Sequence, residues 1–402
     1  MQSLCVPLNI QSEMGYLGTA RRLGDGGSPM TASSRISEER VLDRFLHLVQ
    51  IDSVSFQEAP ITRVLEQALH GLGFSVVNDG TGLSTGNLIA HLAGNCQGST
   101  PIAFNAHMDT VEPGRGIQPV VKDRVVWSSG DTILAADCKA SIAAILEGVM
   151  VSLEAGSPRP DLELIFTYGE ERGHAGAKGL NVSTLGSRMC FTLDAEAAVG
   201  TIITSAPAYY SMKASFKGRA AHSGIAPEEG IDALVAASRA IARMPLGRID
   251  EQTTANIGLI RGGSARNTVP ALVELEGEAR SRDDARLATQ VDAMTRAMRE
   301  EASRAGVTLD LQFKMEYNAF NIAPDAPPVV MACKALERLG LPVTLGTTGG
   351  GSDANDLNNR GLPTVVLGTG MAKAHTVEEH IAVADLVSLS QVVVELMAAA
   401  TR

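Results

Sequence analysis

Two adjacent carboxylates, Glu170 and Glu171, lie in the Gly-rich loop that follows the apolar run 162–166 and are the residues best placed to do chemistry. The run predicts a buried strand, and ligands collect at the carboxyl ends of strands in open α/β sheets. Neighbouring residues at a strand end point in different directions, so one carboxylate can hold a metal while the other moves protons. Because an isolated Glu-Glu pair is more often a solvated acidic loop, the interpretation depends on what the other strand ends carry.

Four further strand or loop ends carry side chains that can bind metals. They are His107, Asp137, Asp194 and His375. Histidine nitrogen and carboxylate oxygen are the ligands that zinc and similar divalent cations use in proteins. Two cations about 3.5–4 Å apart need a bridging carboxylate and several terminal ligands. Together with Glu171, these residues are sufficient for a centre of two divalent metal ions.

Two acidic residues remain beside these candidates. Asp109 lies two residues beyond His107 on the same strand face, where it is expected to accept the second N–H of that imidazole. Glu170 is left free to take a proton from an attacking water. Each candidate also has an ordinary interpretation: His107 as a structural histidine, Asp137 as a helix N-cap and Asp194 as a turn residue. Their occurrence together, in this order, favours the metal centre.

Composition narrows the class of protein. The chain has 402 residues, of which 45% are hydrophobic and 20% charged, which predicts a soluble globular protein of two domains. A formal charge of −11 argues against nucleic acid or an anionic membrane as the main partner. No apolar run is long enough to span a bilayer. The cysteines are odd in number and share no CxxC spacing, which predicts free thiols in the cytoplasm; they are Cys5, Cys96, Cys138, Cys190 and Cys333.

The order of predicted helices and strands changes twice along the chain. Helices and buried strands alternate over 36–206 and 321–402, which predicts one α/β catalytic domain with a mostly parallel sheet and helices on both faces. Residues 207–320 predict an inserted α+β domain of four strands and two helices. Residues 1–35 are rich in Gly, Ser and Arg and predict a disordered leader. The strands expected in the insertion are 209–217, 254–261, 271–281 and 308–316, and the helices are 228–243 and 284–305.

Six segments follow one another in a specific order over about 37–402. They are Phe104-Asn-Ala-His-Met-Asp-Thr-Val111, Ala136-Asp-Cys-Lys-Ala140, Tyr168-Gly-Glu-Glu171, Leu193-Asp194, Gly218-Arg-Ala-Ala-His-Ser-Gly224 and Ala374-His375. In this order the sequence resembles the dinuclear zinc metallopeptidase family that includes peptidase T, carboxypeptidase G and aminoacylase. Gly349-Gly-Gly-Ser-Asp-Ala-Asn355 and His375-Thr376 make it most similar to the peptidase T-like proteins.

The resemblance implies a division of the ligands between two metal ions. One ion would be held by His107, Asp137 and Asp194. The other would be held by Asp137, Glu171 and His375, with Asp137 bridging the two. Glu170 would be the general base and Asp109 would orient His107. The resemblance implies zinc, with cobalt or manganese as alternatives.

Cys138 stands where many relatives have a second aspartate. The resemblance also implies a cis peptide bond between Asp137 and Cys138. The thiol could be a soft metal ligand, but we expect it to face away from the Asp137 carboxylate and to be structural.

The inserted domain would supply contacts to the substrate. By resemblance, His222 stabilises the oxyanion, commonly from a partner subunit, and Asn267 and Arg280 bind polar or carboxylate groups of the substrate. Arg280 could instead be a surface charge at a strand edge. Gly350 and Gly351 allow backbone N–H groups to approach a ligand, although a plain turn has the same composition. The resemblance implies that residues 207–320 are a lid and dimerisation domain and that the protein is a homodimer formed through it.

The function that these residues predict is metal-dependent hydrolysis of amide bonds in short peptides, as in a peptidase T-like aminopeptidase. Two alternatives remain open at this point. One is a deacylase of N-acyl amino acids, which would use the same site on another substrate. The other is a non-catalytic metal-binding protein with the same fold.

Overall fold

The computed structural model describes residues 32–402. Most of the predicted leader, residues 1–31, lies outside the described residues. Its last four residues form the 3-10 helix η1 (Ala32–Arg35). Ser33 is buried there, and its hydroxyl donates a hydrogen bond of 2.8 Å to Glu395 Oε1. The predicted end of the leader at residue 35 is therefore wrong, because these residues pack against the rest of the chain.

One large sheet organises the catalytic unit, which comprises the described residues on either side of the insertion. Its central strands β6, β3, β7 and β16 are parallel, and the strands toward both edges pair mostly antiparallel. The predicted α/β class is confirmed, and the sheet is mixed with a parallel centre. In spatial order the strands are β1 (Ser75–Asn78), β2 (Leu88–Leu92), β6 (Leu162–Thr167), β3 (Ile102–His107), β7 (Cys190–Ala195), β16 (Thr364–Gly368), β8 (Thr201–Ala206) and β14 (Phe320–Asn321), with β15 (Thr344–Thr347) beside β8.

Helices cover both faces of this sheet. Strand β3 is buried throughout, and its residues alternate between two cores: Ile102 and Phe104 join the larger one, and Ala103 joins the smaller one. The larger core includes residues of α1 (Glu38–Val49), α2 (Ala59–Gly71), α3 (Ala136–Glu154), α7 (Pro327–Arg338) and α9 (Val383–Ala399). The smaller core includes a residue of α8 (Asp353–Asn359), which contacts the short helix α4 (Ala175–Gly179).

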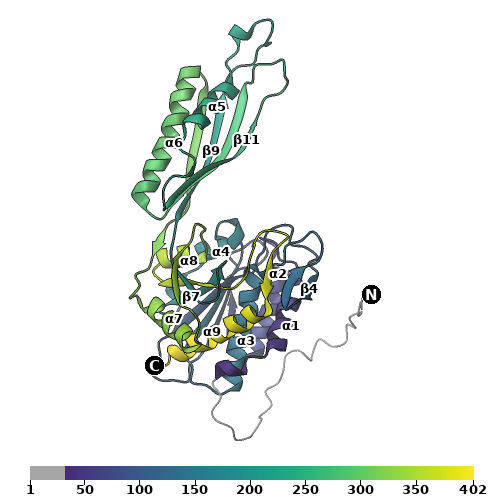
Figure 1. The fold of residues 1–402 in the computed structure, drawn as a ribbon, viewed down its shortest axis with the longest axis vertical. Helices are drawn as coiled ribbons and strands as arrows, with labels where there is room; N and C mark the ends of the chain where they lie inside the picture. The colour runs from purple at the N-terminus through teal and green to yellow at the C-terminus, as the bar shows by residue number, and fades with distance from the viewer. Residues whose placement is uncertain (1–31) are drawn as a thin grey trace.

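The inserted unit stands away from the catalytic unit and has a core of its own (Figure 1). Its sheet, in the order β10-β11-β12-β9-β13, has five strands rather than the predicted four. The additional strand β10 has only two residues, too few to show a periodic pattern. The elements are β9 (Ala208–Lys217), η4 (Pro227–Glu229), α5 (Ala233–Arg243), β10 (Gly247–Arg248), β11 (Thr253–Gly262), β12 (Leu272–Ser281), α6 (Asp284–Ala305) and β13 (Thr308–Tyr317).

The chain crosses between the two units at residues 207 and 318, and we call this region the neck. Asn355 of α8 binds both crossings, because its Nδ2 donates to the carbonyls of Pro207 at 3.1 Å and Asn318 at 2.7 Å. Tyr317 and Tyr209, the residues beside the crossings, pack ring against ring with centroids 5.4 Å apart. Asn355 therefore ties both crossings of the neck to the catalytic unit.

A small sheet supports the loop that carries His375. Strand β17 (His380–Ala382) pairs with β5 (Val125–Ser128), which pairs with β4 (Pro119–Lys122). Ala372 and His380 exchange backbone hydrogen bonds of 3.0 and 3.1 Å, which closes the loop between them. The His380 ring also stacks on Trp127, with centroids 4.1 Å apart. These contacts fix both ends of the segment that presents His375.

Candidate metal centre

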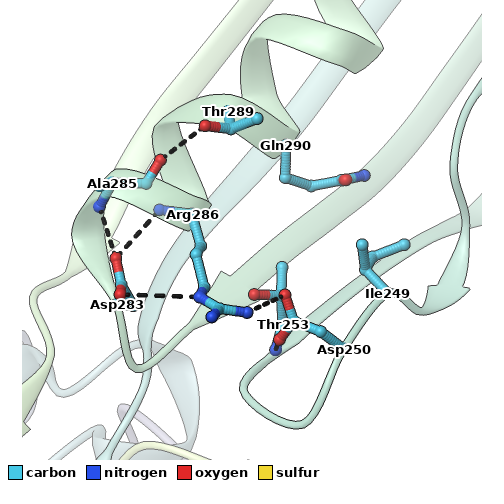
Figure 2. Close-up of a pocket in the computed structure, with 8 residues that line it drawn as sticks. All are labelled: Ile249, Asp250, Thr253, Asp283, Ala285, Arg286, Thr289 and Gln290. Atoms are coloured by element: carbon cyan, nitrogen blue, oxygen red, sulfur yellow. Dashed lines mark hydrogen bonds and ion pairs between the residues drawn. The ribbon is translucent and has the colours of Figure 1, made fainter.

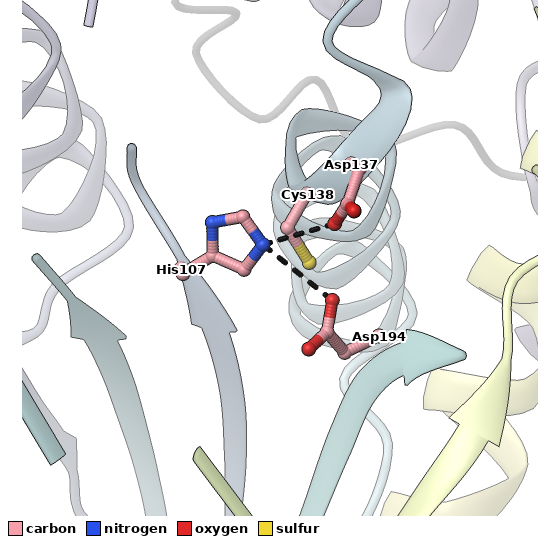
Figure 3. A group of neighbouring side chains, drawn as sticks. All are labelled: His107, Asp137, Cys138 and Asp194. Carbon is pink, nitrogen blue, oxygen red and sulfur yellow. Dashed lines mark hydrogen bonds and ion pairs between the residues drawn. The ribbon is translucent and has the colours of Figure 1, made fainter. Parts of the chain in front are cut away.

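Three of the predicted ligands meet at the carboxyl edge of the parallel strands (Figure 3). His107 ends β3, Asp194 lies near the end of the neighbouring strand β7, and Asp137 lies at the start of α3. His107 Nε2 is 2.9 Å from Asp137 Oδ1 and 3.5 Å from Asp194 Oδ1. The strand order thus brings together residues that are far apart in the sequence.

The other two predicted ligands lie on the opposite side of Asp137. His375 Nε2 is 2.9 Å from Glu171 Oε1 and 3.3 Å from Asp137 Oδ2. The two oxygens of Asp137 therefore face two different histidines, His107 and His375. A carboxylate that presents one oxygen to each of two ligand groups has the arrangement that a bridging ligand needs.

Asp109 contacts the His107 ring with both its carbonyl and its carboxylate. The His107 Nδ1–H donates to the backbone carbonyl of Asp109 at 2.8 Å, whereas the nearer carboxylate oxygen is 3.5 Å away. The carboxylate also accepts hydrogen bonds from the backbone N–H groups of Glu170, at 2.9 Å, and Glu171, at 3.2 Å. The Asp109 carbonyl thus makes the closer contact with the imidazole, and its carboxylate also fixes the Glu170-Glu171 loop. Orientation of His107 by the Asp109 side chain stays a prediction.

Glu379 holds the backbone that presents Asp137. Its buried carboxylate accepts hydrogen bonds of 2.7–2.9 Å from the N–H groups of Leu134, Ala135 and Asp137. Ala135 is left-handed, with φ 61°, and the peptide bond between Asp137 and Cys138 is cis, as the resemblance implied. The sequence analysis missed Glu379, although it lies only four residues after His375.

The charges of this cluster show whether cations fit it. Burial, and then the neighbouring Asp137 carboxylate, raise the pKa of Asp194 to about 7. Hydrogen bonds to Asp137 and Glu171 raise the pKa of His375 to about 10. Without metal, Asp194 and His375 therefore hold their protons more strongly. The proton on Asp194 relieves repulsion from the Asp137 carboxylate, and the proton on His375 lets the ring donate to Asp137 and Glu171. Two divalent cations would take the place of these protons, and the donor set of imidazoles and carboxylates fits them.

Cys138 does not face away from the ligands. Its sulfur belongs to one group of potential donor atoms with the His107 ring and the carboxylates of Asp137 and Asp194, all within 4.8 Å of one another. The expectation that the thiol faces away from the Asp137 carboxylate is therefore wrong. Its S–H donates to the carbonyl of Leu193 at 2.9 Å, and burial raises the pKa of the thiol. Both features favour the structural interpretation, in which Cys138 remains a thiol.

Glu170 is buried at the rim of the centre. One of its oxygens lies within 4.8 Å of donor atoms of His107 and Glu171, and the residue is 8% exposed. Burial raises its pKa well above the ordinary value for a glutamate. A carboxyl group whose proton affinity is raised in this way accepts a proton more readily from a water molecule.

The predicted substrate residues fall into two groups. Arg280 lies at the neck, where its Nη1 is 3.4 Å from the Gly349 carbonyl and its guanidinium lies 4.5 Å from the centre of the Tyr209 ring. Its other nitrogens pair with Glu278 at 3.1 Å. Arg280 is therefore partly enclosed beside the catalytic unit.

His222 and Asn267 lie together at the end of the inserted unit that is farthest from the neck. We call this end the tip (residues 218–231 and 265–269). His222 pairs with Thr268, and the Ser223 N–H donates to the Asn267 carbonyl at 3.0 Å. Strand β9 has ten residues and leads from the neck to the tip, a span of about 30 Å. Within this chain, His222 is thus separated from the metal ligands by roughly the length of a strand.

The glycine run at 349–351 has a packing function. A Cβ at Gly351 would lie 2.3 Å from the Tyr317 ring, so the close approach of that ring requires glycine. The Gly350 N–H already donates to Thr348 Oγ1 at 3.1 Å. A role in binding substrate through these two glycines stays a prediction.

A surface cavity of about 260 Å³ lies elsewhere, beside α6 of the inserted unit (Figure 2). Its charged groups are already paired: Arg286 Nη1 is 2.9 Å from Asp250 Oδ2, and Asp283 caps the first turn of α6. No predicted site residue lines it, so we place the chemistry at the carboxylate and histidine cluster.

Taken together, an α/β unit with clustered acidic and histidine ligands and an inserted α+β unit define a metal-dependent hydrolase. Residues 103–399 match peptidase family M20/M25/M40, and the chain belongs to this family. It is therefore a metallopeptidase, as the sequence predicted. The resemblance to the peptidase T-like proteins is likewise confirmed.

Similar proteins cover the chain almost completely. YqjE of Bacillus subtilis (strain 168), named as uncharacterized, is 41% identical over 371 residues, covering 91% of this chain and 100% of that protein. The aminopeptidase PepT of Bacillus cereus is 39% identical, with a TM-score of 0.85, covering 91% of this chain and 100% of that structure. A tripeptidase of Staphylococcus aureus is 38% identical, with a TM-score of 0.89, covering 91% and 99%.

Proposed function

We propose that this enzyme hydrolyses short peptides at a centre of two divalent cations, with Glu170 as the general base. The observation that carries the proposal is Asp137, whose two oxygens face His107 at 2.9 Å and His375 at 3.3 Å. His107, Asp137 and Asp194 would hold one ion, and Asp137, Glu171 and His375 the other. Zinc is the predicted metal, with cobalt or manganese as alternatives.

The residues of the chain divide the work of amide hydrolysis. Cations bound at these ligands supply Lewis acidity, which polarises the scissile carbonyl and lowers the pKa of water. Glu170 takes the proton of the attacking water and delivers it to the leaving nitrogen, because its burial raises its proton affinity. Asp109 holds the backbone of Glu170 and Glu171 in place through its carboxylate.

The variant Glu170→Gln tests the base. It preserves the size of the side chain but cannot accept the proton, so kcat should fall by about 10³-fold or more while metal content stays at two ions per chain. Glu171→Gln is the matched control and should lose metal as well as activity. Metal analysis and peptide hydrolysis on the same samples separate the two. An active Glu170→Gln enzyme would refute the assignment.

A partner subunit would complete the site. His222 lies about 30 Å along β9 from the neck, so we infer that it reaches the oxyanion of a second copy of this chain. An oxyanion contact of this kind is worth about 3 kcal/mol in the transition state. Exposed apolar side chains on β11, Leu259 and Ile260, support a homodimer formed through the inserted unit.

The substrate is proposed from the relatives, since the similar solved structures are an aminopeptidase and a tripeptidase. A screen of di- and tripeptides against N-acyl amino acids, with metal restored after chelation, tests it: faster cleavage of the acyl amino acids would reject the peptide substrate. A cytoplasmic location is proposed because the four cysteines within residues 32–402 are unpaired. In the same residues, no helix has the length and apolar character needed to cross a membrane.

A further inference from the structure

His174 lies behind the proposed general base, three residues after Glu171 in the same loop. It is 4% exposed, and its Nε2 is 3.5 Å from Glu170 Oε1. On the other side of the ring, Nδ1 is 2.9 Å from Asp356 Oδ2 on α8. An imidazole thus stands between Glu170 and a carboxylate of a different element.

The ring of His174 is fixed from three directions. A carboxylate only accepts hydrogen bonds, so Nδ1 carries the hydrogen that it donates to Asp356. The ring stacks on Tyr317 at the neck, with centroids 4.3 Å apart and planes at 22°. Its own N–H donates to the Glu170 carbonyl at 2.7 Å, in a left-handed conformation with φ 57°. Nε2 is therefore left facing Glu170 with little freedom to turn away.

Glu170 needs such a contact because it must be aligned to move a proton. Among residues 32–402, His174 supplies the only histidine, lysine or arginine nitrogen within 4.0 Å of the Glu170 carboxylate. Contacts of this kind are often long before substrate binds and shorten in the reacting complex. With a hydrogen on Nε2 as well as on Nδ1, the ring donates to Oε1 of Glu170, and the second oxygen is left for the attacking water.

We propose that His174, held by Asp356 and Tyr317, is a positioning residue that orients the Glu170 carboxylate for proton transfer. The proposal rests on the proposed function, in which Glu170 is the base. It goes beyond that function by adding Asp356, His174 and Tyr317 to the residues on which turnover depends. Tyr317 ends β13, so the same contact joins the neck of the inserted unit to the base.

Two substitutions separate this role from simple packing. His174→Asn tolerates the left-handed backbone and keeps an amide near the Nδ1 position for Asp356, but it is too short to reach Glu170. His174→Gln places an amide nitrogen near the Nε2 position and restores that contact. We expect His174→Asn to lower kcat by about 10- to 100-fold with KM within about twofold. His174→Gln should recover most of the lost kcat.

The measurements are made on the metal-loaded enzyme, together with metal content and thermal stability of each variant. Asp356→Asn, which removes the charge that fixes Nδ1, should lower kcat less, by about threefold. His47→Leu, an exposed histidine on α1, is the matched control and should change nothing. A packing role predicts equal losses for His174→Asn and His174→Gln, and that result, or a loss confined to KM or metal content, overturns the proposal.

A double variant keeps the two proposals distinguishable. Adding His174→Asn to Glu170→Gln should cause no further loss of the residual turnover, because the residue acts through Glu170. A further loss as large as that of His174→Asn alone overturns the positioning role. If Glu170→Gln by itself remains active, the assignment of the base fails. If Glu170→Gln is inactive while His174→Asn has the wild-type kcat, only the inference about His174 fails.

Discussion

The metal centre and the inserted unit differ in how their functional side chains are held. At the centre, functional residues are fixed by contacts from distant parts of the chain: the Asp109 carboxylate holds the backbone of Glu170, and the Glu379 carboxylate holds the backbone of Asp137. In the inserted unit the closest side-chain hydrogen bonds of the predicted site residues are local. Arg280 pairs with Glu278, two residues away, and His222 accepts a hydrogen bond from the Gly224 N–H.

This difference indicates which part of the site is complete in one chain. Four of the predicted ligands are buried or half-buried in a cross-linked scaffold, which precise placement of metals requires, whereas His375 is exposed. The predicted substrate residues are divided between the neck, where Arg280 is half-buried, and the tip, where His222 and Asn267 are exposed. We infer that the catalytic unit preforms the chemistry, whereas binding of substrate depends on how the inserted unit, or that of a partner, is placed.

The largest loss of activity is expected for Asp137→Asn, which tests whether the predicted ligands hold two metal ions. It removes the one charge shared by both proposed metal sites, so kcat/KM should fall by more than about 10³-fold and metal content should drop below two ions per chain. Asp310→Asn, at an exposed carboxylate of β13, is the control and should retain metal and activity. Full metal occupancy in Asp137→Asn would refute the bridging role.

His222→Ala tests the tip. It should lower kcat by about 10²-fold with metal content unchanged, because one oxyanion contact is lost. If His222 acts on a partner, mixing and re-associating this variant with Glu170→Gln should restore about a quarter of wild-type activity, since half of the dimers are mixed and each has one intact site. Absence of any restoration, with mixed dimers demonstrated, would place His222 in its own site.

Arg280→Ala tests the neck and should have a smaller effect. Loss of a guanidinium that binds the substrate carboxylate should raise KM by about 10- to 30-fold and change kcat little. A peptide amide lacking that carboxylate should be cleaved equally by wild type and variant. If the variant discriminates between the free acid and the amide as the wild type does, Arg280 is a structural partner of Glu278 and Tyr209.

The residues that the sequence analysis identified share one property. His107, Asp137, Glu171 and Asp194 follow strands or begin a helix, so topology alone predicts that they converge. The bounds of the long elements were likewise predictable, since α6 begins at a capping aspartate and ends before Gly306, with φ 70°. Strand β10, with two residues, has no such signal.

What could not be predicted depends on contacts between distant segments. His174 and Asp356 are 182 positions apart, and neither has a motif of its own. The role of Asp109 depends on whether its carbonyl at 2.8 Å or its carboxylate at 3.5 Å faces the imidazole, which spacing cannot decide. The orientation of Cys138 depends on its hydrogen bond to the carbonyl of Leu193, 55 positions away, which no local pattern indicates.

The smallest expected effect concerns pH and the metal-free protein. The pKa of Asp194 is raised to about 7 in the folded state, above its unfolded value of about 3.9. Its contribution to stability is therefore fully present below about pH 4 and is lost as pH rises through 7, by about 1 kcal/mol per pH unit between about pH 5 and 7.

Thermal unfolding of chelator-treated wild type and Asp194→Asn measures this contribution. Glu379, whose pKa burial also raises to about 7, is present in both proteins, so the difference in slope isolates Asp194. Added zinc should stabilise the wild type more as pH rises, because its ligands bind in their deprotonated forms. Parallel pH profiles of the two metal-free proteins would show that Asp194 carries no extra proton in the folded state, and its raised pKa would then be refuted.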